Sequence, residues 1–419
     1  MAFPSWLSEI GPHEGDLSDR TVFSAGDLRS GTPRRTQLGA EAVESYRGQR
    51  DASDVRRLRL SWEQGSLELL PSKGLSVGAY RHGDWHPFWE PVVTGLISPD
   101  AEDLTGAMLV NGEEVAAMRW VENVAGWIEL RGLSNWGMPS PDPYTGELLP
   151  LHGEASHIPV GEVEIASGAG HIVACGSFDV HHGWWRESEW EDHRDTRPWY
   201  QRGDPQWRVR RLVVVNTSRP QLQVVDEITN VGIEPAKPDW GYHLQLRAAE
   251  GARLLIPSRR VEDRFAGKVP EGFERWRPTP APDSPREERG YVHKGLETTH
   301  DPFGGSAVRA AALYPDAAPT CFTMPAAAYT LSWFSAGGKN TLGFARPETP
   351  EESHIPVPWD GMGPEIGASS LDHDGNLDPE ISHPPLAPGA ALRLYTGLRQ
   401  CSRDDTAELE EHHRHVTRA

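Results

Sequence analysis

The sequence predicts an all-β protein, a large antiparallel sandwich with few short helices. Short runs of alternating apolar and polar residues recur along most of the 419-residue chain, without amphipathic helical segments between them. The 42 glycines and 36 prolines favour many short strands joined by turns over a helical bundle. The 16 tryptophans offer large apolar faces, which can fill a core or cover the C–H side of a sugar ring.

Charge and composition exclude several kinds of partner. The formal net charge of -20 argues against nucleic acid and against an anionic membrane surface, because both need a basic footprint. No apolar run approaches membrane-spanning length, and the first residues, MAFPSWLSEIGPHEG, lack a basic start and an apolar signal core. We therefore expect a cytoplasmic protein. Cys175, Cys321 and Cys401 are widely spaced and odd in number, so three buried or idle thiols are expected.

The chain is expected to divide into three parts: an irregular extension (residues 1–50), one sandwich domain (51–400) and a polar tail (401–419), frayed or forming a short helix. Short helical possibilities lie at residues 38–47. The domain opens with RRLRLSWEQGSLELLPSKGLSVGAYRHG, which predicts two strands around the Gln64-Gly65 turn and a third strand after Lys73-Gly74.

Later elements follow from the same alternation. Hairpin turns are predicted at residues 167–170 and 216–220, the second between the strands RVRRLVVVN and QLQVVDEITN. A charged arm at residues 184–207, rich in tryptophan, is expected to pack against protein because it has more aromatic area than a solvent loop exposes. Residues 262–297 are rich in proline and charge and are expected to be loop. The other predicted strands are residues 114–120, 126–130, 239–247, 252–256, 307–314, 328–334, 341–345 and 391–398.

A loop at residues 131–160, RGLSNWGMPSPDPYTGELLPLHGEASHIPV, is the strongest candidate for a binding site. Its prolines and glycines restrict the backbone and supply tight turns. A loop held this firmly and carrying His152, His157, Asn135 and Trp136 is expected to line a pocket. An ordinary well-packed connection with surface histidines is the alternative.

Several phrases resemble a known family. LPSKGLSVG, GLSNWG, GELLPLHGEASHIP, VVDEITNVG, GYHLQL and GARLLIPS are similar, in this order, to the DUF4432 branch of the aldose 1-epimerase (galactose mutarotase-like) superfamily. The resemblance extends over roughly residues 70–344 and implies one β-supersandwich domain of the galactose mutarotase type, with a sugar-sized cleft on a sheet face. We expect a small carbohydrate as the partner and no cofactor, with a divalent metal as a possibility. A homodimer is a further possibility.

The resemblance implies chemistry as well. In mutarotases a histidine protonates the ring oxygen of a pyranose while a carboxylate takes the proton of the anomeric hydroxyl, and imidazole suits this task because its pKa lies near working pH. By motif position His243 corresponds to the acid and His152 to the assisting histidine. Residues expected to contact the substrate are Asn135, Trp136, His157, Glu154, Asp226 and Glu348. For Asp226, which lies in a strand-to-turn phrase, a structural role is the favoured alternative.

The chain departs from the family pattern at important positions. Glu154 replaces an arginine that usually follows the HG of the loop phrase, which makes an acidic substrate less favoured unless another cation or a metal compensates. The late phrase that usually supplies the catalytic glutamate is closest to LGFARPET, with Ala345 in the glutamate position. Glu348 lies nearby and could be displaced into the role, so the general base is unassigned.

Two alternatives to an isomerase therefore stand. A lyase or other sugar-modifying enzyme could reuse the cleft with a different base or with a divalent metal. Imidazole and carboxylate groups, which suit such a metal, gather in FDVHHGWWRESEWEDH, starting with Asp179 and His181. The segment HIPVPWDGMGPEIG, with His354, Asp360 and Glu365, is another loose polar stretch without a recognised motif. A carbohydrate-binding protein that has lost the catalytic carboxylate is the second alternative, because one fold can host several functions.

Overall fold

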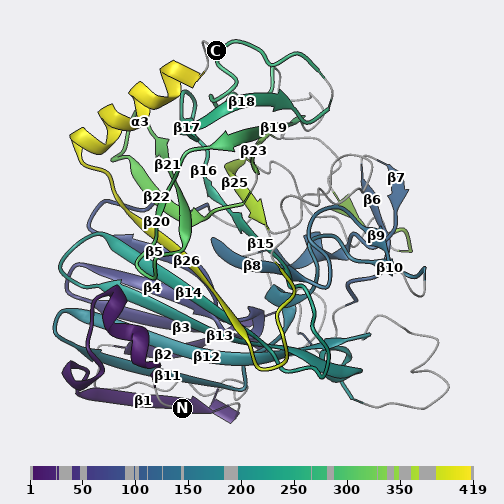
Figure 1. Cartoon of the computed structure of the whole chain (residues 1–419), viewed down its shortest axis with the longest axis vertical. Coiled ribbons are helices and arrows are strands. Elements are labelled where there is room, and N and C mark those ends of the chain that lie inside the picture. Colours follow the sequence, from purple (N-terminus) through teal and green to yellow (C-terminus); the bar gives the residue numbers. More distant parts are fainter. Residues whose placement is uncertain are drawn as a thin grey trace.

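A computed structural model confirms the predicted fold class. The structure describes residues 3–24, 26–27, 40–47, 54–89, 99, 103–110, 112–124, 126–142, 146–183, 197–265, 267–280, 287–327, 329–336, 344–348, 360–367 and 384–416. Two large antiparallel sheets make up most of this part of the chain (Figure 1). The helices whose bounds are described are short 3-10 turns and one α-helix: η1 (Ser5–Ile10), η2 (Glu14–Asp16), η3 (Pro71–Lys73), η5 (Arg119–Asn123), η6 (Ala155–His157), η7 (Trp199–Gln201) and α3 (Arg403–Val416).

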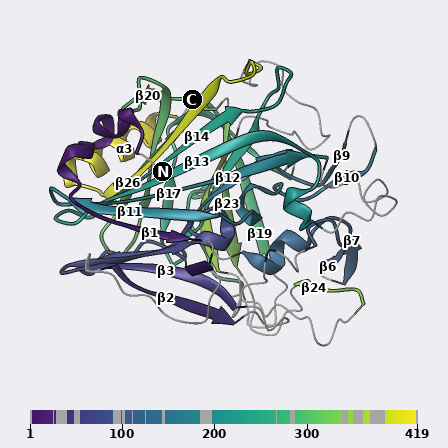
Figure 2. The same cartoon turned by 90° about the horizontal axis from the view of Figure 1, so that it is seen from below.

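The first large sheet has ten strands within the described residues, and Figure 2 shows β26, β14, β13, β12, β11 and β1 side by side. The predicted hairpin at residues 167–170 is present, with Ala169 and Gly170 at φ 47° and 75°. In sheet order the strands are β1 (Asp19–Ser24), β11 (Glu162–Gly168), β12 (His171–His182), β13 (Asp204–Asn216), β14 (Gln221–Asn230), β26 (Ala391–Gln400), β22 (Thr320–Pro325), β21 (Ser306–Leu313) and β17 (Arg253–Leu255), with β20 (Thr298–His300) beside β21.

The second large sheet has eleven strands in the same described part of the chain. In order they are β18 (Ser258–Asp263), β19 (Glu287–Leu296), β23 (Tyr329–Ala336), β25 (Gly361–Gly367), β15 (Asp239–Leu244), β8 (Ile128–Leu133), β5 (Ser76–His82), β4 (Gly65–Leu70), β3 (Asp54–Trp62) and β2 (Ala40–Arg47), with β16 (Leu246–Arg247) beside β25. Two small sheets lie together to the right in Figure 1. They are β9 (Ser140–Pro141) with β10 (Leu148–Leu149), and β24 (Phe344–Ala345) with β6 (Met108–Val110) and β7 (Glu113–Val115).

Both faces of the first sheet are buried around β13, which explains its uninterrupted apolar run. Val213 and Val215 belong to the main core between the two sheets. Leu212 and Val214 face the other way, into a second cluster made with Phe3, Trp6, Leu7, Ile10 and Leu17 of the N-terminal segment. A strand covered on both sides needs no polar face, so the alternation disappears.

Three sequence predictions need correction. Residues 40–47 form strand β2 and not a helix. The predicted loop at residues 262–297 contains β19, whose Tyr291 and His293 point inward while flanking proline and charge disguise the alternation. The strand predicted at residues 114–120 is shorter, because β7 ends at Val115 and η5 begins at Arg119. Of the two alternatives for the tail, the helix is present: α3 buries Leu409 against Leu255 and Leu313 at one end of the first sheet (Figure 1).

The cysteine prediction was wrong for two of the three residues. Cys321 and Cys401 form a disulfide, while Cys175 is free and buried. Although 80 residues separate the two in sequence, β22 lies beside β26, and Cys401 follows directly after β26. The cytoplasmic location stays a prediction, and disulfides are more usual in oxidising compartments.

The described part of the tryptophan-rich arm packs inward, as predicted. Trp199 and Trp207 belong to the main core, and Trp199 Nε1 donates to the carbonyl oxygen of Pro99 at 2.8 Å. Trp184, Trp185 and Trp190 lie outside the described residues. No helix in the described segments is long and apolar enough to cross a membrane.

Candidate active site

Two neighbouring strands of the second sheet bring a histidine and a glutamate together. In the register of β15 and β25, His243 lies directly opposite Glu365. Directly paired residues point to the same side of a sheet, so both side chains share one face. The neighbouring Tyr242 points the other way, because its hydroxyl reaches Asp226 of the first sheet. His243 and Glu365 therefore lie on the face of the second sheet that is turned away from the first.

His152 approaches the same face from the loop predicted to form a binding site. Its φ of 55° is uncommon for a residue with a side chain. Two backbone hydrogen bonds hold it there: His152 N–H donates to the Gly137 carbonyl, and Gly132 N–H donates to the His152 carbonyl, both at 2.8 Å. A backbone held in a sparsely populated conformation is typical of a functional position.

Asn135 folds the loop that presents His152. Its amide nitrogen donates to the carbonyl oxygens of Met138 at 3.1 Å and Pro150 at 2.8 Å, while its amide oxygen accepts from the Ser140 hydroxyl at 2.8 Å. Both the nitrogen and the oxygen of the Asn135 amide thus have hydrogen-bond partners within the loop. Asn135 supports the site through the loop backbone, in addition to any contact with substrate.

The three side chains converge. One nitrogen or oxygen atom from each of His152, His243 and Glu365 lies within 4.8 Å of the other two. His243 Nε2 is 3.2 Å from Glu365 Oε1, and the two imidazole ring centroids are 5.5 Å apart. Two bases and one carboxylate are thus gathered from positions 91 and 122 residues apart in sequence (243 − 152 and 365 − 243).

Three tryptophan rings surround this cluster. Trp120 and Trp136 lie 4.8 Å and 4.9 Å from the ring of His152, and Trp333 lies 5.0 Å from the ring of His243, all measured between centroids. The Arg131 guanidinium covers Trp120 at 4.1 Å. Flat apolar walls beside polar groups are the combination that a sugar ring requires, since it carries both C–H faces and hydroxyls.

Glycines on the two strands make room for these rings. A Cβ atom on Gly241 would lie 2.1 Å from Trp136, and one on Gly367 would lie 2.2 Å from the same ring. A Cβ on Gly361 would lie 2.8 Å from Trp333. In β25 residues 361, 363, 365 and 367 share one face, so three glycines leave Glu365 as the one side chain on it.

Burial and neighbouring charges set the protonation of the cluster. Burial alone raises the pKa of Glu365, but the adjacent imidazole of His243, with His152 and Arg264, outweighs it and lowers this pKa to about 2. Burial lowers the pKa of His152 well below its usual range, a shift that Glu365 only partly opposes. At neutral pH the cluster therefore offers an ionised carboxylate and a neutral His152.

The sequence placed Glu365 only in a loose polar stretch without a recognised motif, and no role was predicted for it. The family resemblance places the base near the phrase LGFARPET, but Ala345 lies in β24, which pairs with β6 in a small sheet. The usable signal was the Gly-x-Gly-x-Glu-x-Gly alternation of GMGPEIG, which marks a strand face cleared for large neighbours around a single carboxylate.

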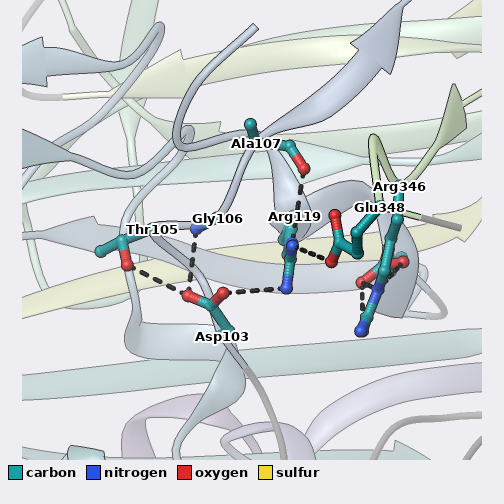
Figure 3. A network of polar contacts seen from close by, with 8 residues as sticks. Asp103, Thr105, Gly106, Ala107, Arg119, Arg346 and Glu348 are labelled. Carbon is teal, nitrogen blue, oxygen red and sulfur yellow. Dashed lines mark hydrogen bonds and ion pairs between the residues drawn. The ribbon is translucent and has the colours of Figure 1, made fainter. Parts of the chain in front are cut away.

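Glu348 is engaged elsewhere. It is exposed and paired with Arg119, which also bonds Asp103 at 2.9 Å (Figure 3). Arg346, beside it, forms a bidentate pair with the buried Glu122 at 2.8 and 2.9 Å. Arg119 and Glu122 both belong to η5, the turn that carries Trp120. Arg346 and Glu348 therefore fasten η5, and Glu348 is engaged away from the two histidines.

Asp226 is sealed between the two sheets. Arg211 donates to it twice, at 2.7 and 2.8 Å, and the Tyr242 hydroxyl donates to it as well. Asp226 and Tyr242 are both 0% exposed. Asp226 therefore lies away from the outer face of the second sheet, in the structural role that was its alternative.

His157 also faces the interior. Its Nε2 is 3.2 Å from Arg131 Nη1, which donates to the Ser156 hydroxyl at 2.5 Å. Burial, reinforced by the charges of Lys73 and Arg131, lowers its pKa well below the usual range. Because His157 is 0% exposed, its place is beneath the site, where it supports Arg131.

Glu154 is buried and accepts a hydrogen bond from the Ser134 hydroxyl. Burial raises its pKa to about 8, although that hydrogen bond opposes the shift. Most of it is therefore uncharged at neutral pH. The negative charge that the sequence led us to expect near His152 is largely absent, and the argument against an acidic substrate weakens.

The raised pKa of Glu154 predicts a pH-dependent stability. The folded chain keeps this proton up to about pH 8, whereas the unfolded chain releases it near the ordinary value of 4.5. The stability that the protonated Glu154 contributes to the fold is thus complete below pH 4.5 and is lost as the pH rises through 8. The free energy of unfolding falls by no more than about 1.4 kcal/mol per pH unit over this range. Glu154→Gln should remove this loss, so urea unfolding should show its free energy of unfolding gaining a few kcal/mol relative to the wild type between pH 5 and 8. A parallel fall in both proteins would contradict the assignment, and the exposed Glu114→Gln is the control.

In the described part of the predicted cluster near Asp179, the side chains bind other groups of the protein and do not gather as metal ligands do. Arg208 binds Asp179 through two hydrogen bonds, at 2.8 and 2.9 Å, and His181 Nδ1 lies 3.2 Å from the Gly203 carbonyl. Asp179, His181 and Arg208 line a cavity of about 740 Å³ on the first sheet. Glu187, Glu189, His193 and His354 lie outside the described residues.

Comparison with solved structures gives the same fold. A protein from Klebsiella pneumoniae, named as a candidate aldose 1-epimerase, superposes with a TM-score of 0.62 at 16% identity, over 98% of this chain and 93% of its own. The Slr1438 protein from Synechocystis sp. PCC 6803 gives 0.51 at 13% identity, over 82% and 94% of the two chains.

Sequence comparison gives no such match. No family model matches the chain, and no curated protein matches it. At these identities the structural likeness shows the fold, which is that of galactose mutarotase-like β-sandwich proteins. Membership of the DUF4432 branch stays a prediction.

Proposed function

We propose that this chain is a carbohydrate-active isomerase that interconverts the anomers of an aldose or an aldose derivative. Glu365 acts as the base that takes the proton of the anomeric hydroxyl. His243 acts as the acid that donates a proton to the ring oxygen, and His152 assists ring opening. The observation that supports this most is the convergence of His152, His243 and Glu365 on one sheet face.

The arrangement suits the chemistry. The anomeric oxygen and the ring oxygen are bonded to the same carbon, so an acid and a base that act on both must lie close together. His243 Nε2 and Glu365 Oε1, 3.2 Å apart, satisfy that condition. Proton transfer to the ring oxygen breaks its bond to the anomeric carbon as the deprotonated hydroxyl becomes the aldehyde. Rotation of the aldehyde and reclosure give the other anomer and return both protons.

The surroundings suit a sugar as well. Trp120, Trp136 and Trp333 provide apolar faces, and among the described residues the Nδ1 atoms of His152 and His243 and the Nε1 atoms of Trp120 and Trp333 are buried without a hydrogen-bond partner. Sugar hydroxyls could satisfy such groups, which are costly to leave unpaired. The resemblance of the motifs to the DUF4432 branch agrees with this proposal.

NMR exchange spectroscopy on a panel of free aldoses and uronic acids tests it. We expect faster exchange between α and β anomers with the chelator-treated protein, and loss of that acceleration in His243→Ala with the fold and most sugar affinity retained. His181→Ala, a histidine on the first sheet, is the matched control. Exchange retained in His243→Ala would remove the assignment of the acid. Saturable sugar binding without exchange would favour a binding protein instead.

A further inference from the structure

The residue types in the cluster also describe a metal-binding set. Two imidazoles and one carboxylate are the three protein ligands of many catalytic zinc sites and of the facial triad that binds iron. His152, His243 and Glu365 supply this set from a loop and two adjacent strands, with the donor atoms of all three within 4.8 Å of one another. We propose that these three side chains form a binding site for a divalent first-row transition-metal ion.

The distances agree with this proposal. Two ligands about 2.0–2.1 Å from a tetrahedral ion are about 3.3 Å apart. His243 Nε2 and Glu365 Oε1 are already 3.2 Å apart. The ligand atom of His152 lies at most 4.8 Å from those of His243 and Glu365. A modest inward movement of its imidazole would bring it to coordination distance.

The environment of the ligands agrees as well. His152 and His243 are each 8% exposed, and each has an Nδ1 atom without a hydrogen-bond partner among the described residues. Neither imidazole is therefore held by hydrogen bonds at both of its ring nitrogens, as a purely structural histidine often is. The rings of Trp120, Trp136 and Trp333 form an apolar shell, which limits solvent access to a bound ion.

The donor atoms predict which ions bind. Imidazole suits zinc, cobalt, iron and nickel, whereas magnesium and calcium prefer oxygen ligands throughout. Three protein ligands leave at least one coordination position open to water or to a ligand oxygen. Coordination uses the lone pairs on imidazole and carboxylate that proton transfer also needs. A bound ion is therefore expected to suppress the proposed proton-transfer reaction.

The test measures metal binding directly, without sugar. We expect calorimetric titration of tag-free, chelator-treated protein with Zn²⁺ to give one strong site per chain, and titration with Co²⁺ to give visible absorption bands of a low-coordinate site. His152→Ala, His243→Ala and Glu365→Gln should each weaken Zn²⁺ binding by more than about tenfold, since even loss of a residue behind a ligand costs that much. Mg²⁺ should not compete.

Controls make the outcome specific. His181→Ala removes a histidine from the first sheet and should retain full Zn²⁺ affinity. Circular dichroism and thermal unfolding show whether each variant is folded, and Glu365→Gln keeps the shape of the side chain. Zn²⁺ affinity that is unchanged in Glu365→Gln and His243→Ala, or no stoichiometric binding by the wild type, would overturn the inference. The isomerase proposal is judged separately, by anomer exchange in the presence of chelator.

Discussion

Glu365→Gln is expected to lower the rate of anomer exchange by roughly 10²–10⁴-fold, the usual contribution of a positioned general base. Glutamine keeps the size of the side chain and can still accept a hydrogen bond from His243, but it cannot take a proton. The loss should therefore appear in kcat, with little change in sugar affinity. Exchange spectroscopy over a range of sugar concentrations separates the two quantities.

Glu348→Gln provides the discriminating comparison. Sequence reasoning left Glu348 as a displaced base, while the structure pairs it with Arg119 at an exposed position. We expect this variant to cost far less activity than Glu365→Gln. The reverse order of effects would return the role of base to the segment around Glu348 and contradict the assignment of Glu365.

The fold could be predicted because its signals are local. Hairpin turns and alternating runs gave β3, β4, β5, β11, β12, β13 and β14, and each needs only neighbouring residues to be recognised. One strand was not predicted because its pattern is disguised. In β19, proline and charge on the N-terminal side hid the inward-facing Tyr291 and His293, and the partner strand that makes them inward-facing lies elsewhere in the chain.

The candidate site was only half predictable, for a related reason. His152 lies in a loop whose prolines and glycines are visible in the sequence, and His243 lies in a recognised phrase. Glu365 becomes meaningful only through its register with His243, a contact between residues 122 positions apart (365 − 243). The burial of Asp226 and Glu154 likewise depends on the opposite sheet and on the folded loop, so sequence alone could not distinguish a ligand contact from a buried support.

The Arg211–Asp226 pair should give the largest effect on stability. Asp226→Ala leaves the Arg211 guanidinium, which is 1% exposed, without its carboxylate partner in the core. Removing one partner of a buried pair typically costs about 3–5 kcal/mol, because an uncompensated charge remains away from water. Urea unfolding of Asp226→Ala should therefore show a free energy of unfolding lower by about that amount.

A triple variant separates the value of the pair from the cost of breaking it. Replacing Arg211 with Met, Asp226 with Leu and Tyr242 with Phe removes all the polar groups of this contact, and apolar replacement of a buried ion pair is often neutral or stabilising. We expect it to recover most of the stability lost in Asp226→Ala. Because Tyr242 precedes His243 on β15, anomer exchange by the stable triple variant then shows whether the contact between the sheets also positions the proposed acid. Full exchange would limit the role of Asp226 to stability, whereas a lower kcat with unchanged stability would make it a positioning residue.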